Sequence, residues 1–324
     1  MFLLLTMFLL KIACRNTFST FFTFCFKFAV EIIFNIQMNC IMKKALFLAL
    51  LFPVSLFAQN WHASFRLGLA NYQGDLQQKS FTFKQSKFVG AFGIRYDLSE
   101  YLIARTHASF SKLRADDQKN KNASFKSRNF NFETKLFEWE LGAQYNIFSL
   151  NDKWWTPYVF AGGALFRIKP TAIDPLGNRV FLQLLSTEGQ GFAPGRKKYK
   201  STQFAIPLGI GAEYALNEDM RVGIELGYRK TFTDYIDDVS TTYADPALLL
   251  ANRGPESVAM AYRRGGPYPA VGSPRGNSKN KDAYYFVELT FTWRPFVDWY
   301  ERTSGIASFK KSKKVGCPGT RVRG

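Results

Sequence analysis

The feature that most constrains the fold is a strict alternation of apolar and polar residues, which recurs in eight runs of about ten residues. In the run Phe137–Ile147, one face carries Phe, Trp, Leu, Ala, Tyr and Ile, while the other carries Glu, Gly, Gln and Asn. A period of two places successive side chains on opposite faces of a β-strand. The sequence therefore predicts an all-β protein of long, two-faced strands. The eight runs are Ala63–Tyr72, Phe88–Leu98, Leu102–Leu113, Phe137–Ile147, Tyr158–Arg167, Phe204–Tyr214, Val222–Phe232 and Tyr285–Trp293.

The length of these runs favours a membrane barrel over a soluble sandwich. A tilted strand needs about 9–11 residues to cross the hydrocarbon core, whereas soluble strands average about 5–6. We expect an eight-stranded antiparallel transmembrane β-barrel whose aromatic face contacts lipid and whose other face lines a narrow lumen. The predicted lumen charge network is Arg66, Arg95, Arg105, Glu138, Glu140, Glu213, Glu225, Arg229, Glu288 and Arg294. The glycines predicted to share that face are Gly93, Gly142, Gly163, Gly209, Gly211, Gly223 and Gly227.

The lengths of the connections between the runs alternate. Short turns follow the second, fourth and sixth runs, at 97–100, 149–153 and 217–219, and long connections occupy 73–87, 114–133, 168–202 and 233–283. Outer-membrane barrels have short periplasmic turns and long external loops. The alternation therefore predicts a bacterial outer-membrane protein with a periplasmic N-terminus. Pro207 interrupts one strand, where we expect a bulge or an end of regular pairing.

The chain begins with two segments that differ from the predicted barrel at 59–296. Residues 42–58 have a charged start, an apolar stretch and a small-residue cleavage site before Gln59, which is typical of a secretion signal. Because such signals act from the N-terminus, we interpret residues 1–41 as a non-genuine upstream extension, the alternative being a long authentic leader. Removing residues 1–58 takes away five basic residues and one acid, so the net charge falls from +18 to +14.

Composition argues against several other functions. The positive charge comes without a basic helix, zinc-ligand spacing or RNA-binding motif, so we expect no nucleic-acid partner. His107 and Ser109 face the lumen together, and Glu138 or Glu140 would be the residue to orient the histidine for catalysis. We favour a non-catalytic lumen histidine, and we predict no catalytic residues, no cofactor and no metal site.

Four acidic residues of the long connections have two interpretations. Asp75, Asp234, Asp237 and Asp238 carry the oxygen ligands that a divalent cation prefers. Such residues more often cap turns or pair with arginine, which is the interpretation we favour.

Four segments spread along the predicted barrel carry a family resemblance. They are Asn71–Leu76 (NYQGDL), Thr156–Gly162 (TPYVFAG), Thr187–Gly191 (TEGQG) and Thr231–Ser240 (TFTDYIDDVS). Together, over about residues 60–296, they resemble the PorG-like outer-membrane barrel family of Bacteroidetes. The resemblance implies an eight-stranded barrel that works with the type IX secretion machinery, beside a periplasmic ring built from a lipoprotein and its partner. The connection 233–283 and the basic tail 297–324 do not match that pattern, so a paralogue with another role stays open.

These observations lead to one preferred function and two alternatives. We predict a non-enzymatic barrel that sits in outer-membrane lipid and anchors periplasmic secretion-ring proteins. The tail would contact such a partner if the partner's surface is acidic, or would simply keep the chain soluble before insertion. The tail residues predicted for this contact are Lys310, Lys311, Lys313, Lys314 and Cys317, the cysteine being either disulfide-bonded to a partner or inert. The alternatives are a small-solute pore and a surface adhesin that uses the connection 233–283.

Overall fold

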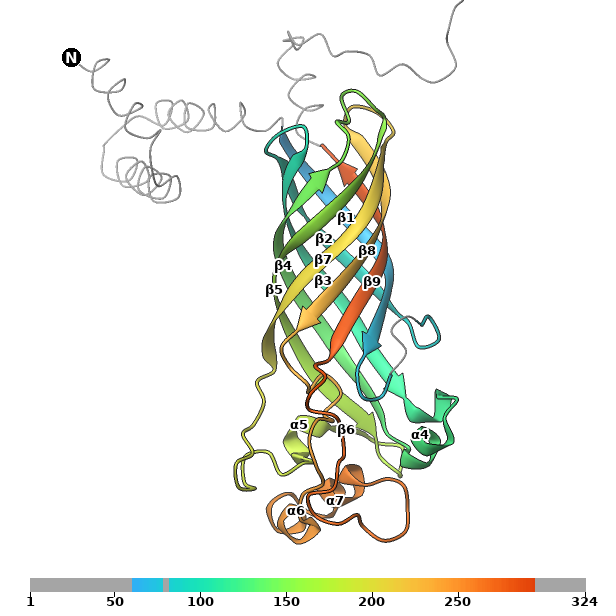
Figure 1. Ribbon diagram of the computed structural model, residues 1–324, viewed down its shortest axis with the longest axis vertical. Coiled ribbons are helices and arrows are strands. Elements are labelled where there is room, and N and C mark those ends of the chain that lie inside the picture. The colour runs from blue at the N-terminus through green and yellow to red at the C-terminus, as the bar shows by residue number, and fades with distance from the viewer. Residues whose placement is uncertain (1–59, 78–81, 295–324) are drawn as a thin grey trace, which may run out of the picture. The chain divides into compact units, whose positions relative to one another are not determined.

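The computed structural model describes residues 60–77 and 82–294, which form an antiparallel β-barrel with an external lobe at one end (Figure 1). Each long strand pairs with its neighbours in antiparallel register, and the barrel closes between the first and last strands, where Phe65 lies opposite Phe291. The predicted eight-stranded antiparallel barrel is thus confirmed. The long strands are β1 (Trp61–Gln73), β2 (Lys87–Asp97), β3 (Leu102–Asp116), β4 (Asn131–Asn146), β5 (Trp155–Ile173), β7 (Thr202–Ala215), β8 (Met220–Thr231) and β9 (Ala283–Trp293).

The two ends of the barrel differ as the connection lengths predict. Short turns join β2 to β3, β4 to β5 and β7 to β8 at one end, the turn end, and the long connections meet at the opposite, loop end (Figure 1). We define the external lobe as residues 174–201 and 232–282. Short helices in these connections are η2 (Asp117–Lys119), α4 (Ala123–Arg128), α5 (Leu182–Leu185), α6 (Pro246–Arg253) and α7 (Pro255–Ala261). Within the described ranges, no helix is both long and apolar enough to cross a bilayer.

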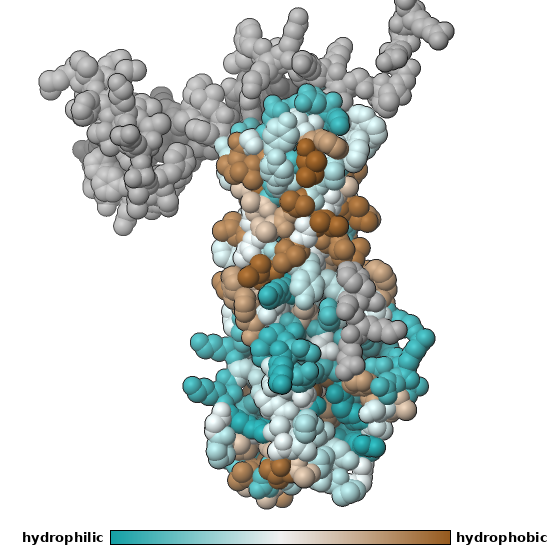
Figure 2. Space-filling view, viewed as in Figure 1, coloured by the Kyte–Doolittle hydropathy of each residue, from teal (hydrophilic) through white to brown (hydrophobic). Residues whose placement is uncertain are grey.

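A belt of exposed apolar side chains surrounds the barrel, and Figure 2 shows part of it as brown residues above the hydrophilic lobe. The side chain of Leu141 on β4 is 59% exposed and that of Leu67 on β1 is 56% exposed. An apolar belt of this extent is stable only against lipid. The exposed residues of the belt include Phe65, Leu67, Phe92, Ile94, Phe110, Phe137, Trp139, Leu141, Val159, Leu165, Leu208, Ile210, Ile224 and Leu289.

The inside and outside of the barrel exchange polarity towards the loop end. On β4, Phe137 points outward and Glu138 inward, but closer to the loop end Lys135 points outward and Leu136 is buried. The buried residues at this end form an apolar core like that of a soluble protein, which includes Leu113, Ala115, Phe130, Phe132, Leu136, Phe166, Ile168, Tyr284 and Phe286. The exchange therefore marks the level at which each strand leaves lipid and enters water.

The strands extend farther than the sequence pattern indicated. β3 continues to Asp116, β4 begins at Asn131 and β5 continues to Ile173, so the predicted connections 114–133 and 168–202 are partly strand. A short strand β6 (Arg179–Phe181) pairs with the end of β5. The prediction was wrong there because it followed outward-facing aromatic residues, whereas the water-exposed part of each strand has its apolar residues inside.

Two local expectations have different outcomes. The ladder between β5 and β7 is interrupted opposite Pro207 and resumes in the same register, so pairing ends locally without a bulge. Gly163, which we placed on the lumen face, points outward instead, where a Cβ would lie 3.3 Å from the ring of the exposed Phe204. The neighbouring Gly162 occupies the inward position opposite Gly142.

The lipid-facing belt predicts that a charged side chain placed in it strongly destabilises the barrel. Replacing Leu141 by Arg should lower the free energy of unfolding from lipid vesicles by about 2–4 kcal/mol, because an arginine near the bilayer midplane loses hydration. Urea unfolding followed by tryptophan fluorescence measures this change. The control is Leu176→Arg, since Leu176 is 86% exposed in the turn between β5 and β6. Equal effects of the two substitutions would contradict a lipid-facing position for Leu141.

Candidate functional site

Arginine–glutamate pairs cross the interior of the barrel and join strands on opposite walls. The Nη1 atom of Arg105 on β3 lies 2.7 Å from Oε2 of Glu225 on β8, which stands on the far side of the barrel. Arg95 on β2 likewise pairs with Glu213 on β7. Because these side chains meet across the middle, the lumen is occupied by a side-chain network at these levels.

The centre of this network is a group of shared carboxylates. Arg66 lies 2.9 Å from Glu225 and 3.5 Å from both Glu140 and Glu288, measured between guanidinium nitrogens and carboxylate oxygens. The Nε atom of Arg105 lies 3.0 Å from Oε1 of Glu140. Arg66 and Arg105 therefore each contact at least two glutamates, which compensates the loss of water around these buried charges.

A third level lies nearer the loop end. Arg229 on β8 contacts Glu138 and Glu140 on β4, each at 3.3 Å, and Tyr284 donates a hydrogen bond to Glu138. The guanidinium of Arg229 also lies 4.0 Å from the centre of the Phe286 ring, a cation–π contact. The network thus ends directly beneath the apolar core of the loop end.

Nine of the ten residues predicted for the lumen network are buried inside the barrel. Arg294 differs, because it follows the last residue of β9 and pairs with Asp219 in the turn between β7 and β8, at 2.6 Å. Its side chain is 22% exposed. The alternation in the sequence continues past Trp293, the last residue of β9, and therefore assigned Arg294 to the lumen. In the structure Arg294 already lies at the turn end.

The suggested catalytic pair does not form in this geometry. The Nε2 atom of His107 lies 3.1 Å from the Ser64 hydroxyl on β1, and the Ser109 hydroxyl has no hydrogen-bond partner among the described residues. The Nδ1 atom of His107 also lacks a partner there, so neither Glu138 nor Glu140 orients the ring. A nucleophile needs a base and the base needs an orienting group; Ser109 has no base within hydrogen-bond reach, and His107, which contacts Ser64 instead, has no group that orients it.

A second polar site closes the mouth of the barrel at the loop end. The Tyr72 hydroxyl lies 2.7 Å from Oδ2 of Asp237 and 2.7 Å from Oδ1 of Asp282. A tyrosine hydroxyl has one proton to donate, and an ionised carboxylate can only accept. One of the two carboxyl groups must therefore be protonated and donate to the tyrosine oxygen. We name the cluster formed by Tyr72, Glu188, Asp234, Asp237, Asp238, Arg275 and Asp282 the mouth seal.

The other half of the mouth seal is organised by Glu188. Its Oε1 atom accepts hydrogen bonds from the backbone N–H of Ser240, at 2.9 Å, and from Arg275, at 3.0 Å. Asp238 accepts from the hydroxyls of Thr187, at 2.6 Å, and Tyr199, at 2.7 Å. These bonds tie the connection after β5 to the connection after β8, and the bonds of Tyr72 to Asp237 and Asp282 join the lobe to β1.

The carboxyl groups of the mouth seal are perturbed by burial. Burial, with smaller contributions from nearby carboxylates, raises the pKa of Asp234 to about 7. Burial also raises the pKa of Asp238 to about 6, although Arg275 opposes the shift. The pKa values of Asp237 and Asp282 lie well above the usual range for the same reason. The seal therefore holds protons at a pH at which ordinary aspartates are ionised.

The structure favours the turn-and-pair interpretation of the four loop aspartates. Asp75 accepts from the backbone N–H of Asn277 at 2.8 Å, and Asp234 accepts from the Ser240 hydroxyl at 2.7 Å. In residues 60–77 and 82–294, no three His, Cys, Asp or Glu side chains are placed to hold a metal ion.

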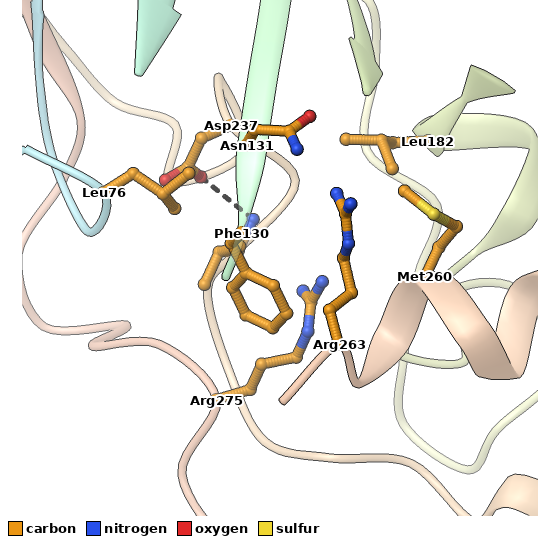
Figure 3. Close-up of a pocket in the computed structure, with 9 residues that line it drawn as sticks. Leu76, Phe130, Asn131, Leu182, Asp237, Met260, Arg263 and Arg275 are labelled. Carbon is orange, nitrogen blue, oxygen red and sulfur yellow. Dashed lines mark hydrogen bonds between the residues drawn. The ribbon is translucent and has the colours of Figure 1, made fainter. Parts of the chain in front are cut away.

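A small cavity of about 10 Å³ lies beside the mouth seal. Figure 3 shows Phe130, Met260 and the guanidinium groups of Arg263 and Arg275 around it, with Asp237 on the opposite side. A cavity of this volume holds about one water molecule. Nε and Nη1 of Arg263 have no hydrogen-bond partner among the described residues, so they are the donors available to such a water.

Sequence reasoning missed several residues of the mouth seal. Tyr72 and Glu188 lie in segments chosen only for their resemblance, and Arg275 and Asp282 were assigned no role. The predicted partner-contact residues Cys317, Lys310, Lys311, Lys313 and Lys314 lie outside the described residues, as do the segments 1–41, 42–58 and 297–324.

The comparison with known protein families agrees with this architecture. The sequence model of the family described as "Outer membrane protein beta-barrel domain" matches residues 45–245. Neisserial surface protein A is similar in structure, with 10% identity, a TM-score of 0.37, and coverage of 72% of this chain and 96% of that one. A major outer membrane protein of Thermus thermophilus has 14% identity, a TM-score of 0.35, and coverage of 72% and 98%. No curated protein matches the sequence.

The contacts of the central carboxylates predict that one substitution, at Glu225, strongly lowers the stability of the barrel. Glu225→Gln should lower the free energy of unfolding by about 3 kcal/mol or more, because Arg66 and Arg105 would lose a buried counter-charge. Denaturant unfolding in lipid vesicles measures the loss. The control is Glu133→Gln at the barrel's outer surface, where Glu133 also contacts three cations and should contribute about 0–1 kcal/mol. A small effect at Glu225 would refute the buried network.

The raised aspartate pKa values predict that the mouth seal weakens as the pH rises. Between about pH 4, where free aspartate ionises, and about pH 7, the folded lobe holds protons that the opened lobe has released. Its stability therefore falls across this window. Hydrogen exchange of residues 233–282 should be faster at pH 7.5 than at pH 5, after correction for intrinsic rates. Asp282→Asn, which mimics the protonated acid, should reduce this dependence, whereas Asp245→Asn, at the N-cap of α6, should not.

Proposed function

The chain belongs to the outer membrane protein β-barrel domain family and lies in the outer membrane of a bacterium, and on this premise we propose that it is a non-enzymatic, non-conducting barrel that anchors periplasmic proteins of a secretion machine. The function would then depend on the surfaces of the barrel rather than on its interior.

The single observation that carries the proposal is the side-chain bridging of the lumen. Arg105 reaches Glu225 and Arg95 reaches Glu213 on opposite walls, and Arg229 reaches Glu138 at the next level. An eight-stranded barrel leaves an interior only wide enough for side chains. A solute would have to break buried ion pairs at three levels and then pass the mouth seal, which argues against the small-solute pore.

The mouth seal supports the link to the type IX machinery. Three of the four segments that resemble the PorG-like family meet there: Tyr72 of NYQGDL binds Asp237 of TFTDYIDDVS, and Thr187 of TEGQG binds Asp238. The resemblance therefore involves residues that share one structural task, which makes coincidence a poor explanation. We propose a PorG-like secretion component, with the basic tail 297–324 contacting an acidic surface of the periplasmic ring.

Affinity purification of the full-length protein from outer membranes in mild detergent, followed by mass spectrometry, tests the proposal. Periplasmic ring proteins should be recovered with the wild type. A tail variant with Lys310, Lys311, Lys313 and Lys314 changed to Gln should recover about tenfold less, because rim charges set the association rate. The matched control changes Lys119, Lys121, Lys126 and Lys279 to Gln on the external side. Recovery of no periplasmic protein by any version would refute the anchoring function.

An open apolar groove at the tip of the external lobe favours surface adhesion as a second candidate. It has a volume of about 440 Å³, is lined by α6 and α7, and contains Leu250, whose side chain is 53% exposed. Figure 1 places both helices at the far end of the lobe. Concave apolar sites of this kind are typical of binding surfaces. The lining residues are Pro246, Ala247, Leu250, Pro255, Val258 and Ala259.

The same purification separates the two candidates. An adhesin with Leu250→Asp would lose its surface ligand and keep its periplasmic partners, whereas Leu184→Asp, the same change at a more exposed leucine on α5, would lose neither. Loss of periplasmic partners with Leu250→Asp would favour a lobe that takes part in secretion itself.

A further inference from the structure

Three lysines lie directly opposite one another on the outer surface of the barrel. Lys112 on β3 is the cross-strand partner of Lys135 on β4, and Lys135 is in turn the partner of Lys169 on β5. All three side chains point outward and are exposed. Arg167, two residues from Lys169 on β5, is exposed on the same face. We name these four residues the basic row.

Such an arrangement is unfavourable in the protein alone. Like charges that stand directly opposite on neighbouring strands destabilise a sheet. In residues 60–77 and 82–294, no ion pair or hydrogen bond reaches the side chains of Lys135, Lys169 or Arg167. The nearby Glu133 does not balance the row, because Lys112 shares it at 3.3 Å with Arg179 at 3.0 Å and Lys87 at 3.7 Å. The surface therefore has an excess of positive charge that an anion would relieve.

The basic row lies at a defined depth. Phe110 and Phe137 form the preceding outward pair on β3 and β4, with ring centres 5.1 Å apart, and they belong to the apolar belt. The three lysines lie two residues farther along their strands, or about 7 Å, whereas Arg167 stands directly opposite Phe137 at the edge of the belt. The inward residues change there from charged to apolar, as at Leu136. This is the level at which hydrocarbon gives way to lipid head groups.

The strands hold the row rigidly at this depth. The residues next to its members in the chain, Leu113, Leu136 and Ile168, are packed in the apolar core of the loop end. The lysine backbones therefore belong to a packed sheet rather than a loop, and the spacing of the Cα atoms that carry the four side chains is fixed before any ligand arrives. A preorganised set of cations binds a multivalent anion with less loss of conformational entropy.

We propose that Lys112, Lys135, Lys169 and Arg167 bind the phosphate groups of an anionic lipid in the outer leaflet of the membrane. Basic residues at the membrane surface attract anionic head groups in this way. The inference requires only the location of the barrel in the outer membrane and is independent of the secretion proposal. The competing explanation is a solvated charged face without a preferred ligand.

The test is a binding titration of the detergent-solubilised, full-length protein with three probes: bis-phosphorylated lipid A, the same lipid after dephosphorylation, and inorganic phosphate. The variant changes Lys112, Lys135 and Lys169 to Gln. Its affinity for the phosphorylated lipid should fall about 100-fold, because the loss of each of the three cations should lower the affinity roughly fivefold. The matched control changes Lys119, Lys121 and Lys126 to Gln, which removes the same charge from the tip of the same β3–β4 hairpin.

Each outcome decides the matter. Weak binding of the dephosphorylated lipid and of inorganic phosphate, with a loss confined to the row variant, supports a lipid phosphate site. Equal losses in the row and control variants would show unspecific charge attraction and overturn the proposal. Binding of inorganic phosphate as tight as that of the lipid would also overturn it, since the ligand would then be a free anion.

A second variant protects the test against a folding defect. Lys135→Glu places a negative charge between Lys112 and Lys169 and should relieve their repulsion. It should therefore raise the thermal stability of the barrel while it lowers the affinity for the phosphorylated lipid about 25-fold, since it removes one cation and adds one anion. Unchanged lipid affinity in this more stable variant would refute the site.

Discussion

The structure depends on one constraint. Each strand passes from lipid into water, and its side chains must suit both surroundings in turn. Within lipid, a charged side chain can stay ionised only on the inside of the barrel, and there it needs a partner because water is excluded. Outside lipid, the same inward positions must become apolar to form a core, as Leu136 does two residues from Glu138 on β4. The exchange of polarity along single strands thus determines where the membrane ends.

The lumen network follows from this requirement. Glu225 and Arg105 belong to strands on opposite walls, and their contact is possible because small residues elsewhere on the lumen face leave room for large side chains to cross. Gly209 is one such position, since a Cβ there would lie 2.6 Å from the Phe160 ring. The result is a stiff, filled barrel, and this is the physical reason to look for function on its surfaces.

The surfaces that remain available differ in chemistry. The external lobe is held over the barrel by carboxyl groups that share protons and hydrogen bonds with Tyr72 and Arg275, and its tip presents the apolar groove between α6 and α7. The barrel wall carries lipid-facing side chains and, at its outer edge, the basic row. A protein partner and a lipid partner would therefore meet different parts of the molecule.

The sequence by itself determined the eight strands, their antiparallel order and the face on which Arg66 or Glu140 lies, because a period of two and alternating connection lengths are local properties. It did not determine which arginine meets which glutamate, the interruption at Pro207 without a bulge, the outward position of Gly163 or the pairing of Arg294 with Asp219. It also did not join Tyr72 to Asp237 and Asp282. Those contacts link residues far apart in the chain, and only the closure and stagger of the barrel fix which distant side chains become neighbours.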